Sequence, residues 1–350
     1  MHKRTVSTLA LLAAVGTSAL GGPITPPPGP VAGTYKTLIE VEPRTAINAV
    51  NTRGDANSTF RIAAPGSYYL TGNVTGEANK HGIEIAADNV SIDMMGFHVV
   101  GVSGSLSGIA TEGTRRSVRI SGGTLSNWGW GGIQLAATGA VIADVAASGN
   151  GADGIDAGDS AVVRSCTASF NGATGITTGL GGLISECVAA ENTLNGFTVG
   201  FGNTIIGCSA YRNDGRGIAA NTGSIVENNA IRLNMLDGIS AGSMAVVRGN
   251  VCSSNGSAAG GSGAGIRING VDCRVESNTC ISNDIGIRVV SSGNMVIRNT
   301  ASGNGTNFDI AGGNRYGPII DATAGGTPAV TGNEGAGTML SGDPWANFAY

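Results

Sequence analysis

The chain has 350 residues, a formal net charge of −4 and only 13% charged side chains, and glycine occupies 59 positions. A weakly acidic surface of mixed sign excludes the electrostatic footprint of a nucleic-acid-binding protein, and that of a protein attracted to anionic membranes. Abundant glycine with few charges is typical of short strands joined by tight turns, and 10 prolines are too few for collagen.

The N-terminus has the order of a secretory signal peptide. Lys3 and Arg4 precede an apolar run over residues 6–15, and small residues follow. Because this run is too short to anchor in a bilayer, we predict a signal peptide over 1–19 and a secreted, periplasmic or cell-surface protein without a membrane span. Its removal leaves a formal charge of −6. Residues 20–33, rich in proline and glycine, are predicted to be a linker.

Residues 34–81 are predicted to form an N-terminal cap and the first strands. The open end of a stack of strands has unpaired edges, which invite end-to-end association unless they are covered. Four large side chains in this segment, Phe60, Tyr68, Tyr69 and Leu70, supply apolar area for that cover.

A repeat occupies residues 82–310. Ten pairs of glycine and a following large apolar residue share one register, and over the middle of the chain these Gly–apolar pairs return every 21 residues. A constant period of this length predicts stacked structural units. The apolar members of the pairs are Ile83, Ile109, Ile133, Ile155, Ile176, Phe197, Ile218, Ile239, Ile266 and Ile287.

Two further apolar positions recur once per unit. One column contains Ile142, Val163, Ile184, Ile205, Val226, Val247, Val275 and Val296, and the other contains Ala147, Ala168, Ala189, Ala210, Ile231, Cys252, Cys280 and Ala301. Three short strands per unit cannot bury themselves in isolation, but coils stacked about 4.8 Å apart share one continuous core. The pattern predicts an all-β fold, a single-stranded parallel β-helix (solenoid) of about ten coils.

Asparagine and cysteine form two polar columns. The first contains Asn150, Asn171, Asn192, Asn213, Asn234, Asn255, Asn283 and Asn304, where left-handed turns and bonds to neighbouring backbone favour asparagine. The second changes from Cys166, Cys187 and Cys208 to Asn229, Asn250, Asn278 and Asn299, whose stacked amides can bond along the column. Stacked cysteines point the same way, which suits disulfide geometry poorly. We therefore expect buried free thiols, with a Cys252–Cys280 bridge as the alternative.

The repeat resembles a known family. The segment GISAGSMAVVRGNVCSSN, residues 238–255, is similar to the right-handed parallel β-helix repeats of the pectate-lyase-like superfamily. Residues 65–73 and 81–101 resemble the opening coils of secreted bacterial proteins with NosD-type repeats. The resemblance implies right-handed coils. It selects no activity, because that superfamily includes lyases, hydrolases, epimerases and proteins with no known activity.

A candidate substrate-binding site lies where an extra residue lengthens one turn, NWGWGG. We expect this turn to hold Trp128 and Trp130 in a solvent-side loop, with Asp153 in the corresponding turn of the next coil. Gln134 and Asp156 begin the strands that follow these two turns. Exposed aromatic rings beside carboxylate and amide groups suit a sugar, which has apolar faces and a hydroxyl rim. The alternative is that both tryptophans pack over the coil and the aspartates form turns.

A second candidate for substrate binding is the pair Arg267 and Arg288, which the repeat places one coil apart on an outward column. Stacked like charges cost stability unless an anion or nearby carboxylates compensate them. The pair therefore either contacts uronate or sulfate groups or is neutralised by local acids such as Asp284. Arg216 and Asp237, in equivalent turns one coil apart, are expected to pair with each other.

No complete catalytic or metal motif is present in the sequence. Asp153 and Asp156 are the candidate catalytic residues, although no pattern shows two carboxylates facing one groove, as glycoside hydrolysis requires. Calcium-assisted lyases of this superfamily need an acidic cluster, and Asp144 with Asp153 and Asp156 is the nearest set that the sequence offers. Ca²⁺ is therefore expected only if the protein is lyase-like. Only His81 and His98 remain after the signal peptide, and no cysteines have zinc spacing, so no metal or other cofactor is predicted.

Residues 311–350 are predicted to be a C-terminal capping tail. Trp345, Phe348 and Tyr350 lie close together in a chain with few aromatic residues, and this favours cover for the last coil over ligand binding.

These observations predict a monomeric secreted or surface protein that binds polysaccharide along one face of a β-helix. The first alternative is a polysaccharide lyase, an epimerase or a glycoside hydrolase of the same superfamily. The second is a purely structural or adhesive protein without a ligand site.

Overall fold

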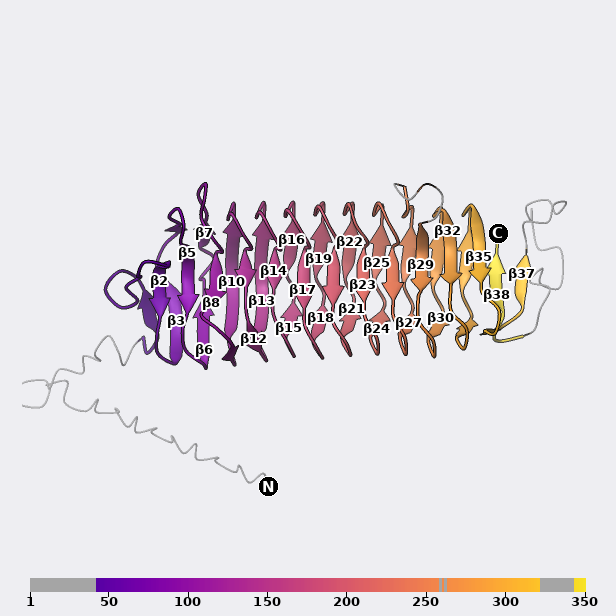
Figure 1. Ribbon diagram of the computed structural model, residues 1–350, viewed down its shortest axis with the longest axis horizontal. Helices are drawn as coiled ribbons and strands as arrows, with labels where there is room; N and C mark the ends of the chain where they lie inside the picture. The colour runs from indigo at the N-terminus through magenta and orange to yellow at the C-terminus, as the bar shows by residue number, and fades with distance from the viewer. Residues whose placement is uncertain (1–41, 258–259, 261–262, 322–342) are drawn as a thin grey trace, which may run out of the picture. The chain divides into compact units, whose positions relative to one another are not determined.

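The computed structural model describes residues 42–257, 260, 263–321 and 343–350, which form a parallel β-solenoid. Figure 1 shows its coils stacked one after another along a single axis. The predicted signal peptide and linker, residues 1–33, lie outside the described residues, as do the first part of the predicted cap and most of the predicted tail. Within the described ranges, no helix is long and apolar enough to cross a bilayer.

Each coil contributes one strand to a twelve-stranded parallel sheet. Its strands are β2 (Ser58–Ile62), β5 (His81–Ile85), β8 (Ile109–Thr111), β11 (Ile133–Gln134), β14 (Ile155–Asp156), β17 (Ile176–Thr178), β20 (Phe197–Val199), β23 (Ile218–Ala220), β26 (Ile239–Ala241), β29 (Ala264–Ile268), β32 (Ile285–Val289) and β35 (Thr306–Ile310). The sheet has two more strands than the sequence has Gly–apolar pairs. Phe60 and Phe308 extend the same column, in register with Ile83 and Ile287, without a glycine before them.

The rest of each coil belongs to a twenty-four-stranded sheet, which covers two faces. Strands β10 and β13 continue around the corner between these faces, so β10 pairs with both β6 and β7. The strands are β1 (Thr45–Ile47), β3 (Gly66–Leu70), β4 (Val74–Thr75), β6 (Val90–Asp93), β7 (His98–Val100), β10 (Arg119–Ser126), β13 (Val141–Ser148), β15 (Val162–Arg164), β16 (Thr167–Ser169), β18 (Leu183–Ser185), β19 (Val188–Ala190), β21 (Thr204–Ile206), β22 (Ser209–Tyr211), β24 (Ile225–Glu227), β25 (Ala230–Arg232), β27 (Val246–Arg248), β28 (Val251–Ser253), β30 (Arg274–Glu276), β31 (Thr279–Ile281), β33 (Met295–Ile297), β34 (Thr300–Ser302), β36 (Arg315–Tyr316), β37 (Ile319–Asp321) and β38 (Asn347–Ala349). Two short strands, β9 (Arg115–Arg116) and β12 (Ala137–Thr138), pair separately.

The three predicted apolar columns are confirmed. Ile155, Ile176 and Phe197 are lateral neighbours in the twelve-stranded sheet, and all are fully buried. The column through Val226 and the column through Ala210 continue in the same way along the two faces of the larger sheet. One hydrophobic core therefore fills the inside of the solenoid from Ile47 to Ala301.

The asparagines of the first polar column lie at the corners of the coil, but they are not the left-handed turn residues that the sequence predicted. The left-handed backbone belongs to the preceding residue, for example Arg212 with φ of 52°, and Asn213 itself points inward and is buried. Its Nδ2 donates to Oδ1 of Asn234 at 2.9 Å and to the carbonyl of Ala189 at 3.1 Å. The buried amides thus satisfy backbone groups that the corner leaves without strand partners.

The second polar column also lies at a buried corner. Asn229 Nδ2 donates to Oδ1 of Asn250 at 3.0 Å, while Cys166 and Cys187 occupy the same place in earlier coils. All six cysteines are buried and unpaired, including Cys252 and Cys280, which are neighbours in β28 and β31. They pack as small apolar side chains.

Both described ends of the solenoid continue the regular pairing. Tyr68 lies in β3, between β1 and β6, and Phe60 lies in β2 beside β5. At the other end Phe348 lies in β38, which pairs with β34 and β37. The indole ring of Trp345 is covered on one side by the guanidinium of Arg298, at 4.3 Å.

Candidate functional site

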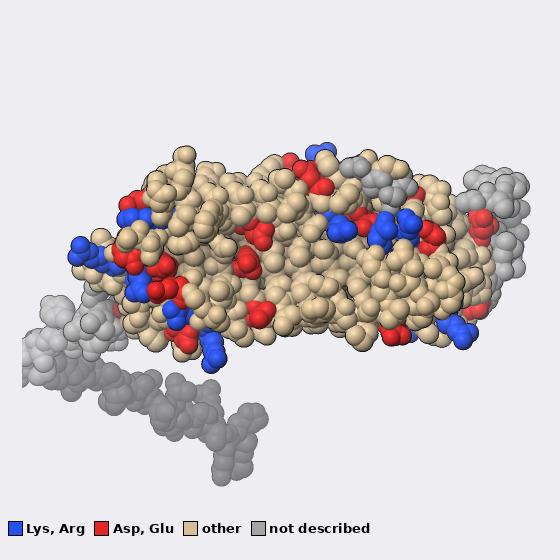
Figure 2. All heavy atoms as spheres, viewed as in Figure 1, with Lys and Arg blue, Asp and Glu red and all other residues tan. Residues whose placement is uncertain are grey.

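One outward column runs along the whole twelve-stranded sheet. Each of its residues follows an inward-pointing Ile or Phe, which is buried except for the partly buried Phe60 and Phe308 at the two ends, so its side chain points to the opposite face of the sheet. In order of the coils they are Arg61, Glu84, Ala110, Gln134, Asp156, Thr177, Thr198, Ala219, Ser240, Arg267, Arg288 and Asp309. Charged residues occupy both ends of this column and its fifth position, Asp156, and the four positions after Asp156 hold small uncharged residues. Figure 2 likewise shows charged side chains gathered mainly toward the two ends of a largely uncharged face.

A shallow pocket lies on this column at the fourth and fifth coils, and we call it the Asp156 pocket. It encloses about 170 Å³ and is lined by the side chains of Gln134, Asp153 and Asp156 with Gly131, Ile133 and Ala152. Gln134 and Asp156 are register partners in β11 and β14. The structure thus brings these two residues and Asp153 to one hollow.

The two carboxylates of the pocket have different environments. Asp153 accepts hydrogen bonds at 2.9 Å from the backbone N–H of Thr174 and from Oγ1 of Thr177. Asp156 accepts only one bond, a long one of 3.4 Å from the N–H of Gly158. Burial raises the pKa of Asp156 above its ordinary value, and the negative charges of Asp153 and Asp159 raise it further. One carboxylate is held as a fixed acceptor, and the other binds a proton more readily.

This environment predicts how Asp156 affects stability. Because its pKa is raised in the folded state, folding disfavours the charged form, and this penalty disappears when the pH falls below the ordinary Asp pKa of about 3.9. Asp156→Asn is therefore expected to be more stable than the wild type at pH 7 and equally stable below about pH 3.5. Urea unfolding at both pH values measures the difference. A variant that is less stable at pH 7 would show that the carboxylate is a structural acceptor instead.

The two tryptophans of the long turn point in opposite directions. Trp130 is 51% exposed, beside the ring of His81, with their centroids 6.2 Å apart and nearly perpendicular planes. Trp128 is 1% exposed, and its Nε1 donates to the carbonyl of Val99 at 2.9 Å. The prediction that Trp128 lies in a solvent-side loop is therefore wrong. The indole fills space that glycines at 76, 82 and 108 leave in the adjacent coils.

Further polar groups connect Trp130 to the Asp156 pocket. Ser107 Oγ donates to Oε1 of Gln134 at 2.8 Å, and the backbone N–H of Ser107 donates to Nδ1 of His81 at 3.1 Å. Burial lowers the pKa of His81, so this imidazole acts as a neutral acceptor. A chain of contacts therefore runs from the Trp130 ring to His81, through the buried Ser107, to Gln134 in the lining of the Asp156 pocket.

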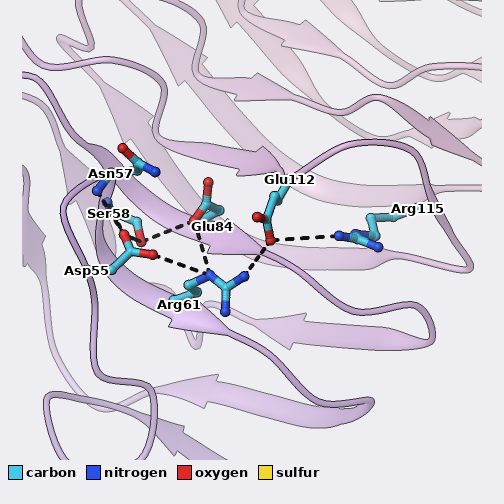
Figure 3. Close-up of polar contacts among 7 residues, drawn as sticks. All are labelled: Asp55, Asn57, Ser58, Arg61, Glu84, Glu112 and Arg115. Carbon is cyan, nitrogen blue, oxygen red and sulfur yellow. Dashed lines mark hydrogen bonds and ion pairs between the residues drawn. The ribbon is translucent and has the colours of Figure 1, made fainter.

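The start of the outward column carries a charged cluster that the sequence analysis missed (Figure 3). The guanidinium of Arg61 forms ion pairs with Asp55, Glu84 and Glu112, and Arg115 also pairs with Glu112. Glu84 is nearly buried, and burial raises its pKa above the ordinary value. Its contacts with Arg61 and with Ser58 Oγ are both 3.5 Å long. The charged groups of this cluster pair with one another, and this favours a structural role for the cluster.

The arginines at the other end are neutralised within the protein. Arg267 Nε contacts Oδ1 of the buried Asp237 at 2.9 Å, and Arg288 Nε contacts Oδ2 of Asp309 at 3.1 Å. Asp284 instead accepts a bond from the backbone N–H of Gly263, so the expectation that it compensates these arginines is wrong. The expected pairing of Arg216 with Asp237 is present, at 3.4 Å. Asp237 therefore serves two guanidinium groups.

A second hollow lies on the column between the two charged ends. It encloses about 330 Å³ over Ala219, with Thr198, Arg216, Ser240 and Asn269 among its lining residues. Although Ser240 occupies an outward position, it is buried, because the amide of Asn269 donates to its Oγ at 2.9 Å.

Two further acids, Asp159 and Asp144, are not in the lining of the Asp156 pocket. Asp159 is exposed, forms an isolated bridge with Thr138 and accepts a bond from the backbone N–H of Leu180. Asp144 lies in β13, on the twenty-four-stranded sheet, with φ of 56°. Across the described part of the chain, no group of three or more His, Cys, Asp or Glu side chains is placed to hold a metal ion.

The comparisons with known proteins agree with this architecture. The family described as "Right handed beta helix region" matches residues 107–251 and, in a second overlapping match, residues 158–305. A comparison with curated proteins finds no significant match.

Several solved structures are similar in fold. The mannuronan C-5 epimerase A-module of Azotobacter vinelandii is 16% identical, with a TM-score of 0.53, over 72% of this chain and 90% of that chain. The Dettilon tailspike protein is 17% identical, with a TM-score of 0.57, over 73% of this chain and 60% of that chain. A double mutant of a periplasmic alginate epimerase is 14% identical, with a TM-score of 0.53, over 79% and 80%. At these identities the likeness shows the fold alone.

Proposed function

Because the chain belongs to the right-handed β-helix family, we propose that it is a secreted or surface protein that binds a polysaccharide along the outward column of its twelve-stranded sheet. The observation that carries this proposal is the Asp156 pocket, which adjoins the turn of Trp130: the backbone N–H of the pocket residue Ala152 donates to the Trp130 carbonyl, and the Trp130 ring is exposed. A sugar ring can pack on the indole while its hydroxyl groups donate to Asp153 and Asp156 and bond to the amide of Gln134.

The outward column suits a polymer better than a single sugar. Coils are spaced by about 4.8 Å, which is of the same order as one sugar unit, so a chain along the axis meets equivalent positions in successive coils. Between the Asp156 pocket and the hollow over Ala219 lie only Thr177 and Thr198, which have short side chains and hydroxyl groups. Two structural neighbours are named as epimerases of mannuronan and alginate, both polysaccharides. We propose the same class of ligand, a polysaccharide, for this protein and do not extend the epimerase activity to it.

Binding is tested with a glycan array followed by calorimetry on the glycans that bind. Trp130→Ala and Gln134→Ala are each expected to weaken binding about tenfold, because each removes one main contact of the sugar. The Trp130 side chain is exposed, so the unfolding free energy of Trp130→Ala should change by less than about 0.5 kcal/mol, whereas Gln134→Ala leaves Oγ of the buried Ser107 without its acceptor and should cost about 1–3 kcal/mol. The matched control is Arg232→Ala, an exposed position in β25 on the other sheet. Unchanged affinity in both pocket variants would remove the proposed site.

The unequal carboxylates favour a second candidate function, acid–base catalysis on the bound polysaccharide. Burial raises the pKa of Asp156, which favours the protonated form that a general acid needs, and Asp156 lies in one pocket with the fixed acceptor Asp153. The proposed catalysis uses no calcium ion, because the described acids form no cluster of three ligands for one. Assays for unsaturated, epimerised or newly reducing products on the glycans that bind decide between catalysis and binding alone. Asp156→Asn should abolish turnover while the glycan still binds.

A further inference from the structure

A second pocket lies far from the Asp156 pocket, on the twenty-four-stranded sheet near its C-terminal end. It encloses about 430 Å³ and is lined by Arg274, Met295, Ile297, Arg315, Tyr316, Gly317 and Trp345. These residues come from β30, β33, β36 and the segment that leads into β38. We call it the Trp345 pocket. Its volume is within the range of pockets for small molecules.

The aromatic wall of this pocket is held in place by its neighbours. The guanidinium of Arg298 lies 4.3 Å from the centre of the Trp345 ring, and its Nε donates to the carbonyl of Pro344 at 2.9 Å. The backbone N–H of Trp345 donates to Asp343 Oδ1 at 2.8 Å. Arg298 covers one side of the indole and is not part of the lining, so the rest of the ring is available to the pocket. Tyr316 and Met295 add exposed apolar surface.

The charge of the lining is one-sided. The described residues of the lining contribute the guanidinium groups of Arg274 and Arg315 and no carboxylate. Arg274 is paired outside the lining, with Glu276 at 2.6 Å, and its Nη1 also lies 3.5 Å from Sδ of Met295. Among the described residues, no carboxylate forms an ion pair with Arg315. The pocket therefore offers one cation that a ligand can neutralise.

The lining selects between kinds of anion. A sugar has many hydroxyl donors, and apart from the phenolic oxygen of Tyr316 the lining side chains offer them no oxygen acceptor. The apolar surface of Trp345, Tyr316, Met295 and Ile297 instead suits a flat apolar ring. We propose that the Trp345 pocket binds a small aromatic carboxylate, with its ring against Trp345 and Tyr316 and its carboxylate paired with Arg315.

Calorimetry with cinnamate as the probe, and with the neutral cinnamyl alcohol as its matched analogue, tests this proposal. Cinnamate is expected to bind with a stoichiometry of one, and the alcohol to bind at least about tenfold more weakly, because it cannot pair with a guanidinium. Arg315→Gln should weaken cinnamate binding about tenfold and leave the affinity for the alcohol unchanged. Arg315 is exposed, so the variant should fold like the wild type. Arg232→Gln is the control.

Three outcomes would overturn the proposal: no saturable binding of cinnamate, equal affinity for acid and alcohol, or an unchanged affinity in Arg315→Gln. Trigalacturonate is added as a competitor. If it displaces cinnamate and binds with the higher affinity of the two, the pocket is assigned to an acidic sugar instead. The titration is repeated in the Trp130→Ala, Gln134→Ala protein. Cinnamate binding should persist there, so a failure of the proposed polysaccharide site leaves this test intact.

Discussion

Val226→Asp is expected to lower the free energy of unfolding by about 4 kcal/mol. Val226 is fully buried in β24, between Ile205 and Val247 of the neighbouring coils. Removing its apolar side chain costs about 1.5–3 kcal/mol, and burying a carboxyl group without a partner costs about 1–3 kcal/mol more, even when it is protonated. Urea unfolding followed by circular dichroism measures the loss.

The matched control is Ala230→Asp in the same coil. Ala230 is exposed in β25, four positions further along the chain, so its substitution should change the unfolding free energy by less than about 0.5 kcal/mol. Equal losses in the two variants would contradict the stacking of coils with a common core, because only the register distinguishes the two positions. A loss confined to Val226→Asp would support it.

The architecture could be predicted from the sequence because a stacked fold repeats each physical requirement once per coil. Ile155, Ile176 and Ile218 are separated by whole numbers of periods, and each occupies the same buried column. A single apolar residue says little about its place in a fold, but a column of them at one spacing defines a face. The first and last coils escaped this reasoning, since Phe60 and Phe308 replace the Gly–Ile pair.

Roles at the corners could not be predicted, because a corner combines two requirements that the sequence does not separate. One residue must adopt a left-handed backbone, and the next must return an amide or thiol to the interior. Arg212 and Leu233 adopt positive φ although neither is a typical turn residue, and the asparagines that follow them are buried. Asparagine can adopt a left-handed backbone and can also bond to backbone groups with its amide. The presence of an asparagine at a corner therefore did not show which of the two roles it has.

The candidate site was predicted in part for the same reason. Gln134 and Asp156 share a column, and their adjacency followed from the period. Trp128 and Trp130 lie in a turn that breaks the period, and alternation there did not indicate which ring points inward. The glycines at 76, 82 and 108 provide the space for Trp128, and they lie 20 or more residues away in the chain. The partners of Arg267 and Arg288 were missed because Asp237 and Asp309 belong to other coils.

Asn229→Leu, a substitution of similar volume, is expected to lower the free energy of unfolding by about 2–4 kcal/mol. The Asn229 side chain accepts a bond from the backbone N–H of Cys208 at 2.8 Å, and its Nδ2 donates to the carbonyl of Ile205 and to Oδ1 of Asn250. Leucine would leave the buried N–H of Cys208 without a partner, which costs about 1–3 kcal/mol, and would remove the two bonds that Nδ2 donates, which adds to the loss. Urea unfolding of the variant measures the effect.

The adjacent residue provides the control, because it separates the two roles of a corner. Asn228 is exposed with φ of 55°, so it is the residue that makes the left-handed turn. Asn228→Gly should change stability by less than about 0.5 kcal/mol, since glycine adopts that backbone without strain. If asparagine served here only as a turn former, Asn228 would be the sensitive position and Asn229 the tolerant one. The opposite order is expected, because the buried amides of Asn229 and of Asn250, Asn278 and Asn299 in the following coils satisfy backbone groups that these corners take out of the sheets.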